Sequence, residues 1–252
     1  MSRAIYPSLK GKSVFISGGG SGIGEGLVQA FAAQGARVAF CDILEAESAA
    51  LAARLGDAEA APVFHRCDLR DIDSLRAVMA QVEADFGGID ILINNAASDD
   101  RHRIEDVTPA YWDERMAVNL RHQFFAAQAA APAMKRAGGG VILNFGSISW
   151  HLALPELALY ETAKAAIEGM TRSLARDLGR DNIRVNCIIP GNVKTQRQMK
   201  WYTPEGEAEI VSQQCLNGRI LPEDVAALAL FLASDDARMC TGHGYFMDAG
   251  WR

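Results

Sequence analysis

The sequence predicts an α/β protein with one doubly wound parallel sheet of about seven strands and helices on both faces. Short β-rich runs alternate with longer alanine-rich helical patterns from end to end, and such alternation is typical of a parallel sheet flanked by helices. The apolar runs 91–93 and 141–143 contain no alternating polar residues, as expected of strands covered on both faces. Because no repeat or Pro/Ser-rich linker interrupts the pattern, we expect a single domain over residues 1–252.

The elements follow one another in a regular order. The β-rich runs predict strands over 13–17, 37–41, 62–66, 90–94, 141–145, 184–189 and 244–247. The alanine-rich patterns predict helices over 23–34, 45–55, 72–86, 116–136, 159–178 and 223–233. The polar and aromatic segment 190–217 breaks this rhythm. Excursions of that length are usually functional, so we expect a substrate loop or lid there.

Composition excludes several classes of protein. The net charge is −6 and no basic run is present, which argues against nucleic acid or an anionic membrane as partner. The five cysteines are scattered without a CxxC motif, so we expect reduced thiols in the cytoplasm and no disulfide or metal framework. The N-terminus lacks the apolar core of a signal peptide, and the longest apolar run, 225–233, is too short to span a bilayer.

A glycine-rich segment follows the first predicted strand and opens the first helix. Residues 17–24 read Ser-Gly-Gly-Gly-Ser-Gly-Ile-Gly, and such glycines let the backbone approach a pyrophosphate at a helix N-terminus. A flexible glycine turn is the alternative, but the strand before and the helix after favour a dinucleotide site. The expected contacts are Gly18, Ser21, Gly22, Ile23 and Gly24.

Asp42 ends the second predicted strand, where a carboxylate can bind the adenosine ribose of the cofactor. No Arg or Lys lies in the glycine loop or directly after Asp42 to receive a 2′-phosphate. We therefore expect NAD, with NADP less favoured. A helix N-cap is the alternative role for Asp42.

Tyr160 and Lys164 lie four residues apart within a predicted helix and so share one helix face. A phenol ionises near pH ~10, and a neighbouring cation lowers that pKa. The pair can therefore act in proton transfer, although this spacing also occurs by chance.

Together these motifs resemble the short-chain dehydrogenase/reductase family over nearly the whole chain. Residues 17–24 match its TGxxxGxG loop with Ser17 at the Thr position, and 94–97 match NNAG with Ala97 in place of glycine. The resemblance implies a Rossmann-type domain. It also implies a catalytic tetrad of Asn119, Ser147, Tyr160 and Lys164.

The resemblance also implies individual roles. Tyr160 would accept the hydroxyl proton, Lys164 would lower the pKa of Tyr160 and bind the nicotinamide ribose, and Ser147 would hold the reacting oxygen. Asn119 would hold a water that relays protons to Lys164. Further cofactor contacts would be Asp68, Leu69, Asn95, Tyr160, Pro190, Gly191, Val193 and Thr195.

Three segments are expected to meet around the reacting carbon: the run 98–103, the residues near Ser147, and the excursion 190–217. Their polar groups and aromatic rings suit a sugar better than a steroid or an acyl chain. A solvated loop is the alternative for 98–103. The candidate substrate contacts are Asn144, Ser147, Trp150, His151, Tyr160, Asn192 and Tyr202.

Segments 98–102, 147–151, 190–195, 200–206 and 248–252 look like those of bacterial sugar 1-dehydrogenases within this family, with Ser98 in place of Asn. The resemblance implies NAD-dependent oxidation of an aldopyranose at C1 to the aldonolactone, with D-xylose as the expected sugar, and a homotetramer. L-arabinose, D-galactose, or another small polyol or hydroxy-ketone are alternative substrates. A non-catalytic NAD-binding regulator is the alternative of a different class.

Overall fold

The computed structural model describes residues 4–58, 60–199 and 203–251. Seven parallel strands form one sheet in the order β3-β2-β1-β4-β5-β6-β7. The strands are β1 Ser13–Ser17, β2 Arg37–Asp42, β3 Val63–Arg66, β4 Ile91–Asn94, β5 Gly140–Phe145, β6 Ile183–Pro190 and β7 Gly244–Met247. The predicted doubly wound sheet is confirmed, and every strand ends within one residue of its expected position.

Ten α-helices connect these strands in the described part of the chain. They are α1 Gly22–Ala33, α2 Glu45–Arg54, α3 Ile72–Phe86, α4 Pro109–Met116, α5 His122–Arg136, α6 Ser149–Leu152, α7 Ala158–Leu178, α8 Gln196–Met199, α9 Pro204–Ser212 and α10 Pro222–Ala233. A π-helical turn, η3 Ala117–Arg121, joins α4 to α5. Short 3-10 turns are η1 Pro7–Leu9, η2 Ile104–Asp106, η4 Gly179–Asp181 and η5 Asp235–Ala237.

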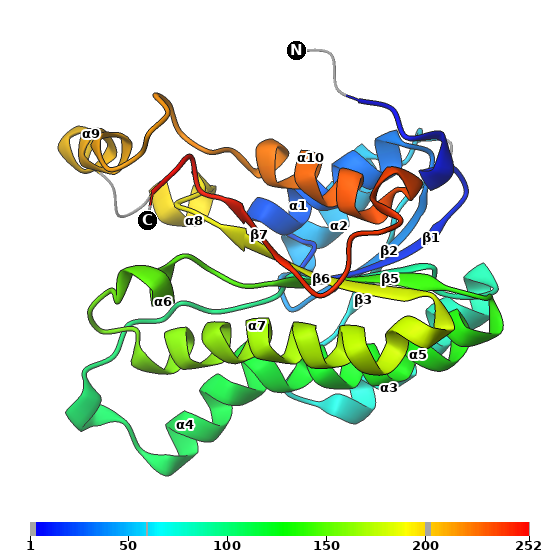
Figure 1. Ribbon diagram of the computed structural model, residues 1–252, viewed down its shortest axis with the longest axis horizontal. Coiled ribbons are helices and arrows are strands. Elements are labelled where there is room, and N and C mark those ends of the chain that lie inside the picture. The colour runs from blue at the N-terminus through cyan, green and yellow to red at the C-terminus, as the bar shows by residue number, and fades with distance from the viewer. Residues whose placement is uncertain (1–3, 59, 200–202, 252) are drawn as a thin grey trace.

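The helices form a layer on each face of the sheet. Figure 1 shows α1, α2 and α10 on one side and α3, α4, α5 and α7 on the other. Along β1, Val14 and Ile16 belong to the core that includes α1 and α10, whereas Phe15 belongs to the core that includes α3 and α5. Successive side chains of a strand point to opposite faces. Both faces are therefore apolar, which explains the continuous apolar runs in the sequence.

The strand order brings several loops to one edge of the sheet. β4 pairs with β1 although two strands, β2 and β3, lie between them in sequence order. Because all the strands are parallel, the segments that follow β1, β4, β5 and β6 leave from the same edge. Open α/β sheets bind their ligands at this carboxyl edge, where the strand order reverses.

One helix differs from its predicted extent. Residues 116–136 were expected to form a single helix, but the helical segment begins at Pro109 and contains the η3 turn. Thr108 caps α4 by accepting a hydrogen bond from the Tyr111 amide to its Oγ1, at 3.2 Å. Pro at the first helical position after a Thr cap is a normal start signal. The Thr108-Pro109 pair therefore indicates in the sequence that the helix begins at residue 109.

The excursion 190–217 contains two helices, α8 and α9, with residues 200–202 outside the described part. None of the described helices has the length and apolar character needed to cross a membrane. All five cysteines are free.

Candidate active site

The glycine loop has the backbone geometry of an anion cradle. Gly18 and Gly22 have φ values of +68° and +56°, a region that L side chains rarely adopt. A Cβ at Gly24 would overlap the Gly18 carbonyl oxygen and lie 2.8 Å from Asn95 Nδ2. Ser21 is the N-cap of the twelve-residue helix α1. This arrangement fits a pyrophosphate held by N–H groups at the start of α1.

Asn95, which was predicted to contact the cofactor, forms hydrogen bonds with this loop. Its Nδ2 donates to the Gly18 carbonyl oxygen at 2.8 Å, and its amide donates to Ser17 Oγ at 3.1 Å. Ser17 Oγ also accepts from the Ala96 amide at 3.3 Å. The hydroxyl at position 17 therefore ties the glycine loop to the end of β4.

Asp42 faces the same loop. Its Oδ2 accepts a hydrogen bond from the Gly20 amide at 2.9 Å and its Oδ1 accepts one from the Leu44 amide at 3.0 Å. The N-cap of α2 is Leu44, so Asp42 does not cap that helix. The next residue, Ile43, is largely exposed and apolar. The carboxylate is therefore fixed beside the cradle without a cation next to it in sequence, which fits an unphosphorylated ribose.

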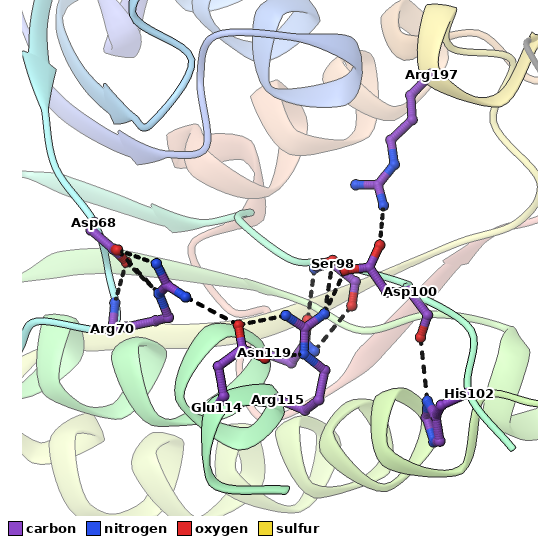
Figure 2. A network of polar contacts seen from close by, with 9 residues as sticks. All are labelled: Asp68, Arg70, Ser98, Asp100, His102, Glu114, Arg115, Asn119 and Arg197. Carbon is purple, nitrogen blue, oxygen red and sulfur yellow. Dashed lines mark hydrogen bonds and ion pairs between the residues drawn. The ribbon is translucent and has the colours of Figure 1, made fainter. Parts of the chain in front are cut away.

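Asp68 is placed after β3, but its carboxylate has a partner within the chain. Arg70 Nη2 lies 2.6 Å from Asp68 Oδ2, and Arg70 Nη1 lies 3.2 Å from Glu114 Oε1 (Figure 2). Hydrogen bonds from Arg70 lower the pKa of Asp68. Leu69 is buried. Contact of Asp68 and Leu69 with an adenine ring stays a prediction.

The segment after β6 returns to the glycine loop. Gly191 follows Pro190, and Val193 forms a parallel bridge with Ile220. Thr195 lies against the loop, because its Cγ2 would be 3.2 Å from a Cβ at Gly22. Thr195 is therefore brought beside Gly22 of the glycine loop, and contact of these residues with a cofactor stays a prediction.

Lys164 and Tyr160 occupy one face of α7, as expected from their spacing. Lys164 is 2% exposed, and its Nζ lies 5.3 Å from the centroid of the Tyr160 ring. The Nζ donates to the Phe145 carbonyl oxygen at 2.7 Å. Burial lowers the pKa of Lys164 to about 8, because desolvation disfavours the charged ammonium.

The pKa of Tyr160 is raised in this structure, and its lowering by Lys164 stays a prediction. Burial raises the pKa of Tyr160 well above its ordinary value, and the Asp99 carboxylate raises it further. The Ser147 hydroxyl, through a hydrogen bond, and the Arg197 charge act in the opposite direction on the pKa of Tyr160. The side chains of the protein thus leave the phenol neutral, since desolvation outweighs the charges around it.

Ser147 bonds Tyr160, and Asn119 belongs to the π turn that packs against α7. Ser147 Oγ accepts a hydrogen bond from the Ser149 amide at 3.1 Å, in addition to its bond with Tyr160. Asn119 is completely buried within the π turn, a feature that recurs at functional sites. Its Oδ1 accepts from the Ser98 amide at 2.8 Å and its Nδ2 donates to the Ser98 carbonyl at 3.1 Å. The Asn119 side chain thus fastens the segment after β4, and its predicted water-holding role stays a prediction.

Asn144 was predicted to contact the substrate, and the structure contradicts this. The side chain is completely buried beneath the site. Its Oδ1 accepts a hydrogen bond from Asn94 Nδ2 at 2.9 Å and its Nδ2 donates to Thr171 Oγ1 at 3.0 Å. Both ends of the amide therefore serve to join β4, β5 and α7.

Trp150 and His151 contact Glu168 on α7, two helical turns beyond Tyr160. Trp150 Nε1 donates to Glu168 Oε1 at 2.7 Å, and His151 Nε2 lies 3.1 Å from the same oxygen. His151 and Glu168 line a cavity of about 440 Å³ that extends to Phe246 on β7. Contact of these two rings with a substrate stays a prediction.

The remaining predicted contacts belong to the excursion. Asn192 Oδ1 accepts a hydrogen bond from Arg219 Nη2 at 2.7 Å, and Arg219 also pairs with Glu207 of α9. Asn192 thus links the start of the excursion to α9. Tyr202 lies outside the described residues.

Sequence reasoning missed an arginine network beside the site. Figure 2 shows Asp100 between Arg115 from α4 and Arg197 from α8. Arg115 Nη1 lies 2.6 Å from Asp100 Oδ2, and Arg197 Nη2 lies 3.1 Å from Asp100 Oδ1 and 3.0 Å from Asp99 Oδ1. The acidic run was visible in the sequence, but nothing in it pairs these distant arginines with that run.

The fold and this set of side chains define an oxidoreductase of the Rossmann type. Residues 18–252 match the family described as Enoyl-(Acyl carrier protein) reductase. The chain belongs to the short-chain dehydrogenase/reductase family.

Relatives with known names share most of the chain. D-xylose 1-dehydrogenase of Caulobacter vibrioides is 64% identical over the full length of both chains. The protein named "Probable galactose dehydrogenase GalD" of Rhizobium meliloti is 48% identical over 97% of this chain and 96% of its own. A short chain dehydrogenase from Burkholderia cenocepacia, solved in complex with NADP, has a TM-score of 0.89 and 31% identity over 96% of this chain and 98% of its own.

Proposed function

We propose that this protein is an NAD-dependent aldose 1-dehydrogenase that oxidises D-xylose at C1 to the aldonolactone. The observation that carries the choice of sugar is the 64% identity over the full chain with a D-xylose 1-dehydrogenase. The chemistry is supported by Ser147, Tyr160 and Lys164, which lie together at the carboxyl edge of the sheet with Lys164 Nζ 5.3 Å from the phenol ring centroid.

The cofactor is proposed to be NAD. Bound as the oxidised nicotinamide, it would accept a hydride from the sugar carbon. The amides of 18–24 would hold its pyrophosphate, and Asp42 would bind the adenosine ribose. The Asp42 carboxylate supports NAD over NADP, because a negative charge fixed 2.9 Å from the Gly20 amide would repel a 2′-phosphate. Further contacts are proposed for Pro190, Gly191, Val193 and Thr195, of which Thr195 lies against Gly22.

Within the protein, Tyr160 would accept the proton of the C1 hydroxyl. Ser147 would hold the reacting oxygen and position it for this transfer. Lys164 would keep a cation beside the phenol as it ionises, in a buried site where charges interact strongly. A non-catalytic regulator would have no need for this acid–base pair.

The test is a set of initial rates with D-xylose, L-arabinose, D-galactose, D-glucose and small polyols, each with NAD and with NADP. We expect D-xylose with NAD to give the highest kcat/KM, measured by NADH absorbance. The variant Tyr160→Phe should retain NAD binding and lose roughly 100-fold or more in kcat. Absence of turnover with every pentose and hexose would refute the proposal.

D-galactose is the second candidate substrate. Its support is the 48% identity with the Rhizobium protein named as a galactose dehydrogenase. A higher kcat/KM for D-galactose than for D-xylose in the same set of rates would favour this alternative.

We also propose a homotetramer in the cytoplasm. Trp112 on α4 and Phe124 on α5 are each 43% exposed, and Ile104 nearby in the chain is 79% exposed. Large exposed apolar side chains of this kind often mark subunit contacts. The five free cysteines support a reducing compartment. Sedimentation velocity measures the oligomeric state directly.

A further inference from the structure

Residues 98–102, which we call the strap, form one wall of the site. Asn119 holds it at one end through both backbone groups of Ser98. At the other end the His102 amide donates to the Glu156 carbonyl oxygen at 2.9 Å, and the Leu159 amide bonds His102 Nε2 at 3.3 Å. The strap therefore runs from the π turn to the start of α7, one residue before Tyr160.

Asp100 within the strap is held by a buried arginine. The Arg115 side chain is 10% exposed and its Nη1 lies 2.6 Å from Asp100 Oδ2. Ser98 Oγ donates to the same oxygen at 2.7 Å. Glu114 Oε1 pairs with the other terminal nitrogen of Arg115, Nη2, at 2.6 Å. The other oxygen of Asp100 is thereby fixed in a direction that faces α8.

The Arg197 side chain extends from α8 toward Asp100 of the strap, as Figure 2 shows. Its Nη2 lies 3.0 Å from Asp99 Oδ1 and 3.1 Å from Asp100 Oδ1. None of the four residues of α8 is buried, so apolar packing contributes little to its position. The Arg197 side chain is 55% exposed, and exposed ion pairs are individually weak. Such an attachment can be made and broken as ligands enter and leave.

The two partners of this ion pair also act on the catalytic groups. The Asp99 carboxylate raises the pKa of both Tyr160 and Lys164, whereas the Arg197 charge lowers the pKa of Tyr160. Asp99 comes from the strap and Arg197 from α8, so opposite charges act on the phenol from two separate elements. The other polar groups that act on this pair are Ser147 after β5, His122 on α5 and Cys187 on β6.

We propose that Arg197 and Asp99 form a latch through which docking of α8 on the strap also sets the charge that the catalytic phenol faces. The proposal rests on the proposed function and assigns Arg197 and Asp99 as positioning residues. With the latch closed, the guanidinium offsets the Asp99 carboxylate. With the latch open, Asp99 faces Tyr160 alone and the phenol holds its proton more tightly. Docking of α8 and readiness of the base are then one event.

The experiment compares Arg197→Gln, Arg197→Lys and Asp99→Asn with the unaltered enzyme on D-xylose and NAD. In the pH profile of kcat/KM we expect Arg197→Gln to move the rise of activity to higher pH by about half a unit or more, and Asp99→Asn to move it to lower pH. Arg197→Lys should restore most of the unaltered profile. Arg197→Gln should also raise KM for the sugar several-fold, because α8 is less firmly held.

Arg103→Gln is the matched control, because Arg103 is an exposed arginine just after the strap that pairs with Glu105. A purely structural role would lower the rates of both latch variants without moving their pH profiles apart. Shifts in the same direction, or no shift in either variant while D-xylose is oxidised normally, would overturn the latch.

A second readout does not depend on sugar turnover. The Met199 amide donates to the Thr195 carbonyl oxygen at 3.0 Å. Hydrogen exchange at this amide should be several-fold faster in Arg197→Gln than in Arg103→Gln. Equal exchange rates would refute the latch even if the enzyme proves to oxidise another substrate. Failure of the unaltered enzyme on all sugars, with faster exchange in Arg197→Gln, would refute only the proposed function.

Discussion

At the scale of single residues, desolvation sets the protonation of the catalytic pair. The same burial lowers the pKa of Lys164 to about 8 and raises the pKa of Tyr160, because it disfavours a cation and an anion alike. Sequence spacing predicted that the two side chains meet. It could not predict their depth in the protein, which depends on what packs around α7, and so it did not indicate that burial raises the pKa of Tyr160.

Asn144 gives a residue-scale prediction about stability. Asn144→Ala removes one hydrogen bond from Asn94 and one from Thr171 inside the protein, while Asn94 Nδ2 keeps its bond to the Gln123 carbonyl oxygen. Unpaired buried groups cost about 1–3 kcal/mol each. We expect the free energy of unfolding in urea to fall by at least that amount. Asn217→Ala, at an exposed position, is the control and should leave the free energy unchanged, while an equal and small effect in both variants would contradict the assignment.

At the scale of elements, the glycine loop and α1 give a second prediction. Gly24→Ala would place a methyl group against the Gly18 carbonyl oxygen and Asn95 Nδ2, so the loop must open. We expect NAD affinity to fall at least roughly 10-fold by calorimetry, since the N–H groups no longer converge on the pyrophosphate. Gly169→Ala in α7 is the matched control, because a Cβ there meets nothing within 4 Å. That variant should bind NAD normally and gain about 0.5–1 kcal/mol in stability; equal affinities in the two variants would refute the role of Gly24.

Strands were the easiest elements to predict. Apolar runs that are buried on both faces leave a continuous signal, and all seven strands lie within one residue of expectation. The π turn around Asn119 left no such signal, because it is a five-residue stretch between two α-helices in one continuous helical pattern. The arginine network was equally hidden, since Arg115 and Arg197 reach Asp100 through the fold and not through sequence spacing.

At the scale of the whole molecule, a buried histidine makes stability depend on pH. His122 is completely buried, with Nε2 3.2 Å from the Ala96 carbonyl oxygen. Burial, and then the charge of Lys164, lower the pKa of His122 to about 4. Unfolded histidine titrates near pH ~6.5. Between these values the unfolded chain binds more protons than the folded one, so stability is full above about pH 6.5 and is lost as the pH falls toward about 4.

The measurement is the free energy of unfolding in urea at a series of pH values from about 7 to about 4.5. The histidine should account for a loss of up to about 3 kcal/mol across this window. His122→Gln removes the titrating group, so its free energy should fall less steeply with acid than that of the unaltered protein. Parallel curves for the two proteins would show that His122 is not the cause.

The way in which Asn119 holds Ser98 has a consequence for how such enzymes diversify. Both hydrogen bonds go to the backbone of position 98 and neither goes to its side chain. A substitution at this position can therefore alter what the wall presents to a ligand while the wall keeps its attachment to the π turn. Selection for a new substrate could act here one side chain at a time, without first passing through a misassembled catalytic centre.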